Sequence, residues 1–331
     1  MQAPLSRRRV IAISAAAAGL ALLPVGVQAA VPTATEWRGR ALGASASLTL
    51  NHSDRHEARR LIERIEAEIR RLERIFSLYM PDSELVKLNR DGVLDNPSAE
   101  LVELLAACRT YWNITGGLFD PSVQPLWEAY REHFASVGAG SLEQKTAAAL
   151  PKVGFDGVLI DRNRIAFARP GMGLTLNGIA QGYITDRIVE MIRAAGLTSC
   201  LADIGECRAL GLAADGNAWR VGIENPLGNG EVAKVLEVKD RAVATSSSLG
   251  FRFEESGRYN HILDPRTGLS ARRYAAVTVV AQSAEKADAL STAFSLMEPG
   301  TARAILGKLE NIEVILIDFD GKITGIRMEE L

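Results

Sequence analysis

The stretch LGASASLTLNHSDRHEARRLIERIEAEIRRLERIF, residues 42–76, decides the fold. In its first part, residues 42–50, apolar side chains alternate with small or polar ones, and this alternation predicts a strand. In its second part, apolar residues recur at the spacing of one helix face, with Arg and Glu between them. They are Ala58, Leu61, Ile62, Ile65, Ile69, Leu72, Ile75 and Phe76. The stretch therefore predicts a strand followed directly by a long amphipathic helix.

The chain beyond residue 76 continues with helices and strands in separate blocks. Helices are predicted from Pro97-Ser98 to Gly116, from about Asn177 to Ala195, and from Ser283 to Leu296. Strands are predicted as a hairpin over Val158–Phe167, at Cys200–Ile204, Trp219–Ile223, Val232–Val238, Val243–Thr245 and Ala275–Ala281, and as a last hairpin with a type I′ turn at Asp320-Gly321. This order, with short joins between strands, favours an α+β fold with antiparallel sheets over a doubly wound parallel sheet. No Gly-x-Gly-x-x-Gly follows a strand, so a dinucleotide-binding fold of that type has no support.

Residues 1–30 have the pattern of an export signal. Arg7 and Arg8 follow Ser6, an apolar run covers Ala12–Val27, and Val27-Gln28-Ala29 is a small-x-small cleavage pattern. The arginine pair indicates the twin-arginine route and a periplasmic protein. The alternative is an uncleaved anchor, but this run is shorter than the roughly 20 residues that span a bilayer. We expect a mature domain of residues 31–331, with no stable membrane insertion after cleavage.

Charge and cysteine content exclude several classes of protein. The formal net charge is −2, so the sequence predicts no general binding to nucleic acid, which requires a basic surface. The three cysteines, Cys108, Cys200 and Cys207, form neither a Cys-x-x-Cys motif nor an even-numbered framework. Zinc and thiol chemistry are therefore not indicated.

Two segments in the first half have polar residues or glycines that a core does not require. Tyr79, in SLYMPDSEL at 77–85, is placed either to pack at a helix end or to contact an aromatic ligand. In Gly116-Gly117-Leu118-Phe119-Asp120-Pro121, paired glycines allow close approach of a ligand, and Asp120 could accept a hydrogen bond from it. The alternative for this segment is a helix stop followed by a loop.

Two further segments suggest phosphate and metal binding. NGIAQGY, residues 177–183, stands at a helix start, where amide groups suit phosphates, and Gly178 and Gly182 leave one face bare. Asp288 and Thr292 are four residues apart on one helix face, and their oxygens suit Mg²⁺. His261, in HILDPRTG, could act as a base or orient a phosphate. The alternatives are a solvated helix face for Asp288 and a structural role for His261.

These segments, taken in order, resemble the ApbE family of FAD:protein FMN transferases. The strings are SLYMPDSELVKLN, TGGLFDPSVQPLW, LNGIAQGYITD, HILDPRTG and ADALSTA. The resemblance implies a T-fold-like α+β structure with FAD in a cleft between two closely joined subdomains. It also implies Mg²⁺-dependent transfer of FMN from FAD to a Ser or Thr of another protein, with release of AMP. ALGASASLTL, ADIGE and the signal are similar to the NosX branch of the family. That branch implies a membrane-bound, flavin-bearing regulator of nitrous oxide reduction as the partner.

The resemblance also assigns roles to residues. The FAD-site positions of the family fall on Leu42, Tyr79, Leu118, Phe119, Asp120, Thr175, Gln181 and Ile262. The metal positions fall on the backbone carbonyl of Gly178 or Ala180 and on Asp288, Thr292 and Ser291. His261 is expected to assist attack by the hydroxyl of the partner protein.

The sequence departs from the family pattern at three places. Leu42-Gly43-Ala44 replaces Met-Gly-Thr, Ala180-Gln181-Gly182 replaces Ala-Lys-Gly or Gly-Glu-Gly, and Gly205-Glu206-Cys207 replaces Gly-Gly-Asp or Gly-Gly-Asn. These departures motivate the alternative of a non-catalytic periplasmic FAD carrier or assembly factor. A third reading is hydrolysis of FAD to FMN and AMP.

Overall fold

The computed structural model describes residues 11–13, 33–52, 54–135, 140–228 and 230–327. The predicted signal at residues 1–30 lies outside these ranges except for Ile11–Ile13, which forms strand β1. No helix among the described residues has the length and apolar character needed to cross a membrane.

The stretch at residues 42–76 forms the second strand of a hairpin and then the longest helix. Strands β2 (Thr33–Ala41) and β3 (Ala44–His52) pair antiparallel, and α1 (Arg55–Phe76) follows. Asp54 caps α1 by accepting hydrogen bonds from the amides of His56 and Glu57. The predicted helix is confirmed, whereas the strand begins at Ala44 because residue 42 lies in the hairpin turn.

An eight-stranded sheet forms the centre of the molecule, with the order β14-β13-β12-β11-β8-β7-β3-β2. Its other strands are β7 (Cys200–Asp203), β8 (Cys207–Leu210), β11 (Ala242–Ser247), β12 (Ala276–Ala281), β13 (Glu313–Ile317) and β14 (Ile323–Arg327). Every neighbouring pair is antiparallel. The α+β fold with antiparallel sheets is therefore confirmed.

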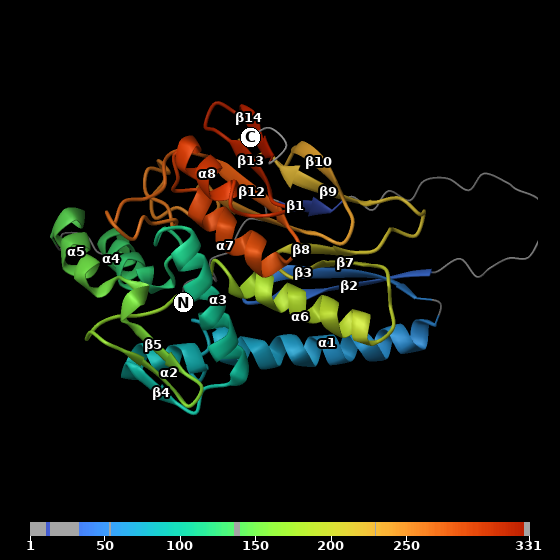
Figure 1. Cartoon of the computed structure of the whole chain (residues 1–331), viewed down its shortest axis with the longest axis horizontal. Coiled ribbons are helices and arrows are strands. Elements are labelled where there is room, and N and C mark those ends of the chain that lie inside the picture. The colour runs from blue at the N-terminus through green and yellow to red at the C-terminus, as the bar shows by residue number, and fades with distance from the viewer. Residues whose placement is uncertain (1–10, 14–32, 53, 136–139, 229, 328–331) are drawn as a thin grey trace, which may run out of the picture.

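Both faces of this sheet are covered. Helices α1, α6 (Ala180–Ala194) and α7 (Ala284–Phe294) lie along one face (Figure 1). A smaller sheet of β1, β9 (Trp219–Glu224) and β10 (Val232–Val238) packs on the other. In β12, Val277 joins the helix-side core and Val280 joins the other core. Each such buried side chain contributes about 1.5–3 kcal/mol relative to an exposed one.

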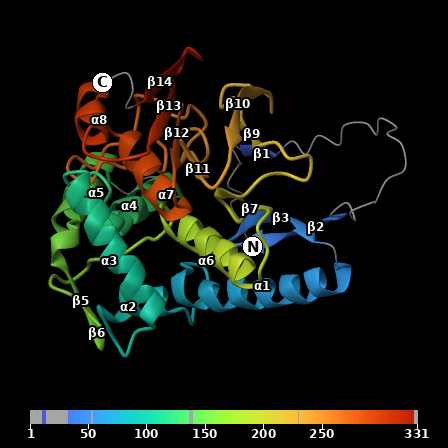
Figure 2. The ribbon, with the colours of Figure 1, turned by 45° about the vertical axis from the view of Figure 1, so that its right-hand side comes forward.

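The remaining elements gather at one end of the central sheet (Figure 2). They are α2 (Glu84–Asp91), α3 (Ala99–Ile114), α4 (Gln124–Ala135), α5 (Leu142–Ala149), α8 (Pro299–Leu306), and the sheet β4-β6-β5, made of Val93–Asp95, Arg164–Phe167 and Val158–Asp161. Helices α4 and α5 share a third apolar cluster with the loop at residues 253–263.

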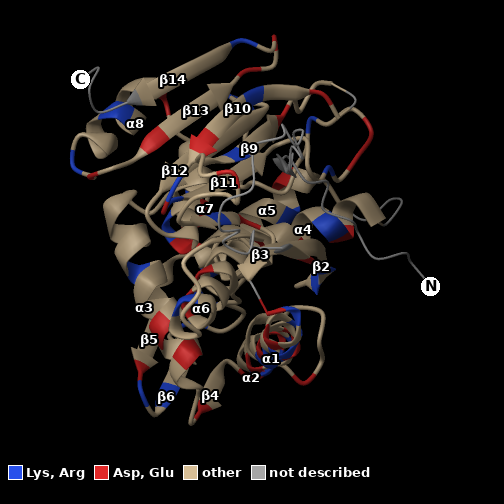
Figure 3. Cartoon of the chain, turned by 90° about the vertical axis from the view of Figure 1, so that its right-hand side faces the viewer, with Lys and Arg blue, Asp and Glu red and all other residues tan. Residues whose placement is uncertain are grey.

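The charged side chains of the described residues are mixed in sign over the view of Figure 3. Helix α1, seen end-on there, has both Arg and Glu on its outer face. This distribution agrees with the small net charge of −2.

Candidate functional site

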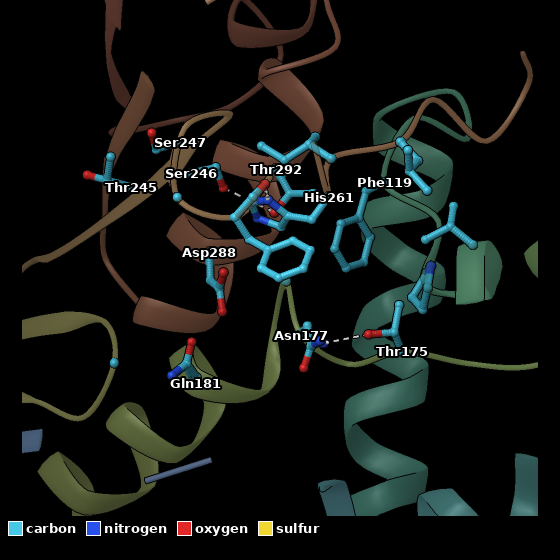
Figure 4. A pocket seen from close by; sticks show the side chains of 18 of the residues that line it. Phe119, Thr175, Asn177, Gln181, Thr245, Ser246, Ser247, His261, Asp288 and Thr292 are labelled. Atoms are coloured by element: carbon cyan, nitrogen blue, oxygen red, sulfur yellow. Dashed lines mark hydrogen bonds between the residues drawn. The ribbon is translucent and has the colours of Figure 1, made fainter. Parts of the chain in front are cut away.

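A pocket lies where the helix-covered sheet meets the cluster around α4 (Figure 4). One side is built from the start of β3, the end of β11, the start of α6 and the middle of α7. The other side is built from the connection between α3 and α4 and from residues 250–263. Asp203, Gly205 and Glu206 at the β7–β8 turn and Trp127 of α4 also line it, so the pocket collects residues from widely separated parts of the chain.

Asp288 and Thr292 enter the pocket from α7 and face the start of α6. Asp288 Oδ2 accepts a hydrogen bond of 3.2 Å from the amide of Gly182. A Cβ at Gly178 would lie 2.8 Å from Thr292 Oγ1, closer than real Cβ contacts allow. Glycine at 178 thus brings the backbone before α6 against the Thr292 hydroxyl. The predicted helix is confirmed as α6, but it begins at Ala180 and not at about Asn177, so Gly178 lies in the loop before the helix.

Ser246, at the end of β11, adds a hydroxyl that the sequence analysis missed. Its Oγ lies 2.8 Å from Ser291 Oγ and 3.2 Å from Thr292 Oγ1. Ser291 is fully buried and also donates to the carbonyl of Asp288. Ser291 therefore supports the polar end of the pocket without lining it.

His261 lines the pocket with a defined ring orientation. Its Nδ1 lies 3.1 Å from the carbonyl oxygen of Phe251. A carbonyl only accepts hydrogen bonds, so this contact requires a proton on Nδ1. In the neutral ring the lone pair is then on Nε2, the nitrogen suited to take a proton.

Aromatic rings form a further part of the pocket lining, its aromatic end. Phe119, Trp127 and Phe251 all line it, and the Trp127 and Phe251 ring centroids are 6.2 Å apart. Phe251 also meets the His261 ring edge-on. Such rings suit a flat conjugated ligand. Trp127 and Phe251 were not predicted, because an aromatic residue in a helix or loop is typical of packing.

Asp120 lines the pocket, but hydrogen bonds within the protein already hold its carboxylate. Its Oδ1 accepts from the amide and hydroxyl of Ser122, and its Oδ2 accepts from Trp112 Nε1 and the Phe155 amide. Burial raises the pKa of this carboxyl, and these bonds oppose that effect. Asp120 therefore fixes the α3–α4 connection, and its acceptance of a hydrogen bond from a ligand stays a prediction.

The structure brings most of the predicted site residues to this pocket. Those lining it are Leu118, Phe119, Asp120, Thr175, Gly178, Gln181, His261, Ile262, Asp288 and Thr292. Leu42, Tyr79, Ala180 and Ser291 are not among the lining residues.

Ser291 is explained by its burial beneath the polar end, and Leu42, Tyr79 and Ala180 each have a local reason to lie outside. Leu42 sits in the β2–β3 turn with φ 46°, packs against the main core, and leaves Ala44 to line the pocket. Tyr79 is 65% exposed after the end of α1. Ala180 is buried in the first turn of α6.

Oxygen atoms at the polar end fit a magnesium ion. Within the described ranges there is no group of three or more His, Cys, Asp or Glu that could hold a metal. Mg²⁺ commonly takes one or two carboxylates and completes its shell with water and phosphate oxygens. Asp288, the Thr292 hydroxyl and the Gly178 carbonyl would supply that kind of donor set.

Comparisons with known proteins agree with this geometry. The family model described as the ApbE family matches residues 42–316. The FAD:protein FMN transferase of Treponema pallidum is 30% identical over 294 residues, 81% of this chain and 79% of the relative. That of Haemophilus influenzae is 29% identical over 275 residues, 77% of each chain.

Two solved structures have the same fold. The ApbE protein of Thermotoga maritima aligns with a TM-score of 0.80 at 28% identity, covering 90% of this chain and 98% of that one. The flavinyl transferase ApbE of Pseudomonas stutzeri, in its apo form, aligns with a TM-score of 0.76 at 26% identity, covering 90% and 97%.

Proposed function

This chain belongs to the ApbE family, and we propose that it transfers FMN from FAD to a Ser or Thr hydroxyl of another protein. Curated relatives are named FAD:protein FMN transferase. The observation that carries the proposal is one pocket that places Asp288 and Thr292, His261, and an aromatic wall around a common space. A dinucleotide with a charged centre and two flat rings matches these three parts.

At the polar end, Asp288 and Thr292 would hold Mg²⁺ together with the Gly178 carbonyl. The bound ion would neutralise charge on the pyrophosphate of FAD. Ser246 keeps the Thr292 hydroxyl oriented through its 3.2 Å contact. Positioning and charge stabilisation are the main sources of catalysis in phosphoryl transfer.

His261 would take the proton of the acceptor hydroxyl. The Phe251 carbonyl holds the proton on Nδ1, so Nε2 has the lone pair that receives it. The hydroxyl oxygen then bonds to the FMN phosphorus while the bond from that phosphorus to the bridging oxygen breaks. AMP leaves with that oxygen, and the product is a phosphoester of FMN on the acceptor protein.

We also propose that the chain works in the periplasm on a partner of the nitrous oxide reduction system. Residues 1–30 support export by the twin-arginine route. The resemblance of ALGASASLTL and ADIGE to the NosX branch supports a membrane-bound flavin-bearing regulator as acceptor.

One observation favours a second candidate function, a non-catalytic FAD carrier. Gln181 and Glu206 line the pocket and are buried at the positions that depart from the family pattern. A neutral amide in place of a charged side chain alters the electrostatics where the pyrophosphate would lie. Both candidates bind FAD, but only the transferase modifies a partner.

The test is intact-mass analysis of a flavin-accepting domain incubated with the chain, FAD and Mg²⁺. We expect a mass increase of one FMN on the acceptor, lost with Asp288→Ala and kept with Asp320→Ala, which removes an exposed carboxylate far along the chain. The acceptor should be one that another family member modifies. If the chain binds FAD but forms no adduct on this acceptor, the transferase function is ruled out and the carrier function remains.

A further inference from the structure

A buried carboxylate outside the pocket joins the two helices that hold its polar end. Asp186 lies on α6 and is 8% exposed. Its Oδ1 accepts from the amide of Ala284 at 2.8 Å, and its Oδ2 accepts from the amide of Glu285 at 3.0 Å. These are the first two amides of α7, which have no acceptor within their own helix. Asp186 therefore caps α7 from a neighbouring helix.

Arg208, on β8, balances the charge of this carboxylate. Its Nη1 lies 2.5 Å from Asp186 Oδ1, and its side chain is largely buried. Burial raises the pKa of the Asp186 carboxyl, while Arg208 and the two amides act in the opposite direction. The carboxylate consequently ties α6, α7 and the central sheet together at one point.

The two helices meet over two consecutive turns. Gly182, one turn before Asp186 on α6, donates its amide to Asp288, one turn after Ala284 on α7. Residues four apart share a helix face, so the two contacts are stacked. A Cβ at Gly182 would overlap the backbone carbonyl of Ala284, so only glycine permits this approach. The helices lie side by side in Figures 1 and 2.

We propose that Asp186 is a positioning residue that sets the affinity of the pocket for its divalent cation. Asp288 and Thr292 stand one and two turns beyond the capped amides, so the cap fixes where their oxygens lie relative to Gly178. This inference rests on the proposed function, because it assigns a cation to Asp288 and Thr292. Residues that orient metal ligands typically change metal affinity by 10–100-fold when they are replaced.

The test measures binding of Mn²⁺, as the probe ion, to the full-length chain with FAD, from the electron paramagnetic resonance signal of free Mn²⁺. Asp186→Asn keeps the side-chain volume but replaces one acceptor oxygen with a donor. We expect it to raise the Kd for Mn²⁺ by about 10–100-fold.

The matched control is Asp54→Asn. Asp54 also caps a helix by accepting from two amides, at the start of α1, which has no pocket-lining residue in the described chain. We expect a small loss of thermal stability and an unchanged Kd.

A double variant addresses the charge that Asp186→Asn leaves behind, because Arg208 is then buried without its partner. Asp186→Asn/Arg208→Gln removes both charges and is measured beside the single variant. It is expected to bind Mn²⁺ as weakly as the single variant.

The outcomes separate this inference from the proposed function. If the wild type binds Mn²⁺, Asp288→Ala does not, and either Asp186 variant binds as the wild type does, the positioning role is overturned and the metal site stands. If Asp288→Ala binds as tightly as the wild type, the metal assignment itself fails, and both proposals fall with it.

Discussion

At the scale of single residues, the pocket depends on how each polar side chain is held. Asp120 and Asp288 are both buried aspartates that line the pocket. Four donors of the protein converge on the Asp120 carboxylate, so it organises the loop, whereas Asp288 faces the helix start where glycines bring the backbone close. Residue type alone would have given both the same role.

His261 is the residue whose replacement should separate chemistry from binding. His261→Gln keeps a polar group beside the Phe251 carbonyl but removes the basic ring nitrogen. We expect the rate of FMN transfer to fall by about 10²–10⁴-fold, the usual contribution of a general base. The Kd for FAD should stay within about threefold of the wild type, because binding rests mainly on the rest of the pocket.

Single-turnover transfer and FAD titration measure these two quantities. His133→Gln is the control, because His133 lies on α4 and packs its ring against Phe134 outside the pocket lining. A His261→Gln enzyme that transfers FMN at the wild-type rate would rule out the base.

At the scale of elements, the first turn of α7 contains Glu285, a partly buried carboxyl that affects stability. Burial raises the pKa of Glu285 to about 7 from 4.5, with repulsion from Asp186 and Glu103 adding to it and a hydrogen bond from Tyr111 opposing it. A raised folded-state pKa means that the folded protein favours the protonated form. The contribution of protonated Glu285 to the free energy of unfolding is therefore fully present below about pH 4.5. It is lost as the pH rises through about 7.

Glu285→Gln should remove this dependence, because an amide stays neutral at every pH. We expect the melting temperature of the variant to exceed that of the wild type at about pH 8 and the difference to shrink towards about pH 5. Glu310→Gln, at an exposed position, should give curves parallel to the wild type. A variant whose advantage is the same at both pH values would contradict the assignment.

The elements that sequence predicted are those with a strong local pattern. Helix α1 has a long apolar face, and α3 and α7 begin at Ser98 and Ser283, whose hydroxyls cap them. The short helices α2, α4, α5 and α8 were not predicted, because helices of this length depend on packing more than on their own sequence. The prediction of a type I′ turn at Asp320-Gly321 was wrong. Such a turn requires a positive φ at both residues, but only Gly321 has one, and it lies in a five-residue loop between β13 and β14.

At the scale of the whole molecule, the pocket exists only because distant segments meet. The resemblance to a family indicated which segments gather, and ten of the predicted residues do line one pocket. The roles of Ser246, Trp127 and Phe251 were not predicted, because Ser246 near the end of β11, Trp127 in the first turn of α4 and Phe251 in the loop after β11 meet only in the folded chain. The local sequence around each residue does not indicate this contact.

Trp127 tests whether the aromatic end binds a ring of FAD, because it joins the α4 cluster to the pocket. Its ring packs against Phe251 and Phe253, and the Arg131 guanidinium lies over the Trp127 ring, 5.9 Å from its centroid. If a flavin or adenine ring stacks there, Trp127→Leu should weaken FAD binding roughly tenfold, the effect of losing one aromatic stacking partner.

Trp37→Leu is the control, since Trp37 lies on β2 and donates to Glu66 away from the pocket. Titration followed by flavin fluorescence measures both variants. Equal weakening in the two would mean that general stability, and not the aromatic wall, controls FAD affinity, whereas a selective loss at Trp127 would show that the cluster around α4 forms half of the binding site.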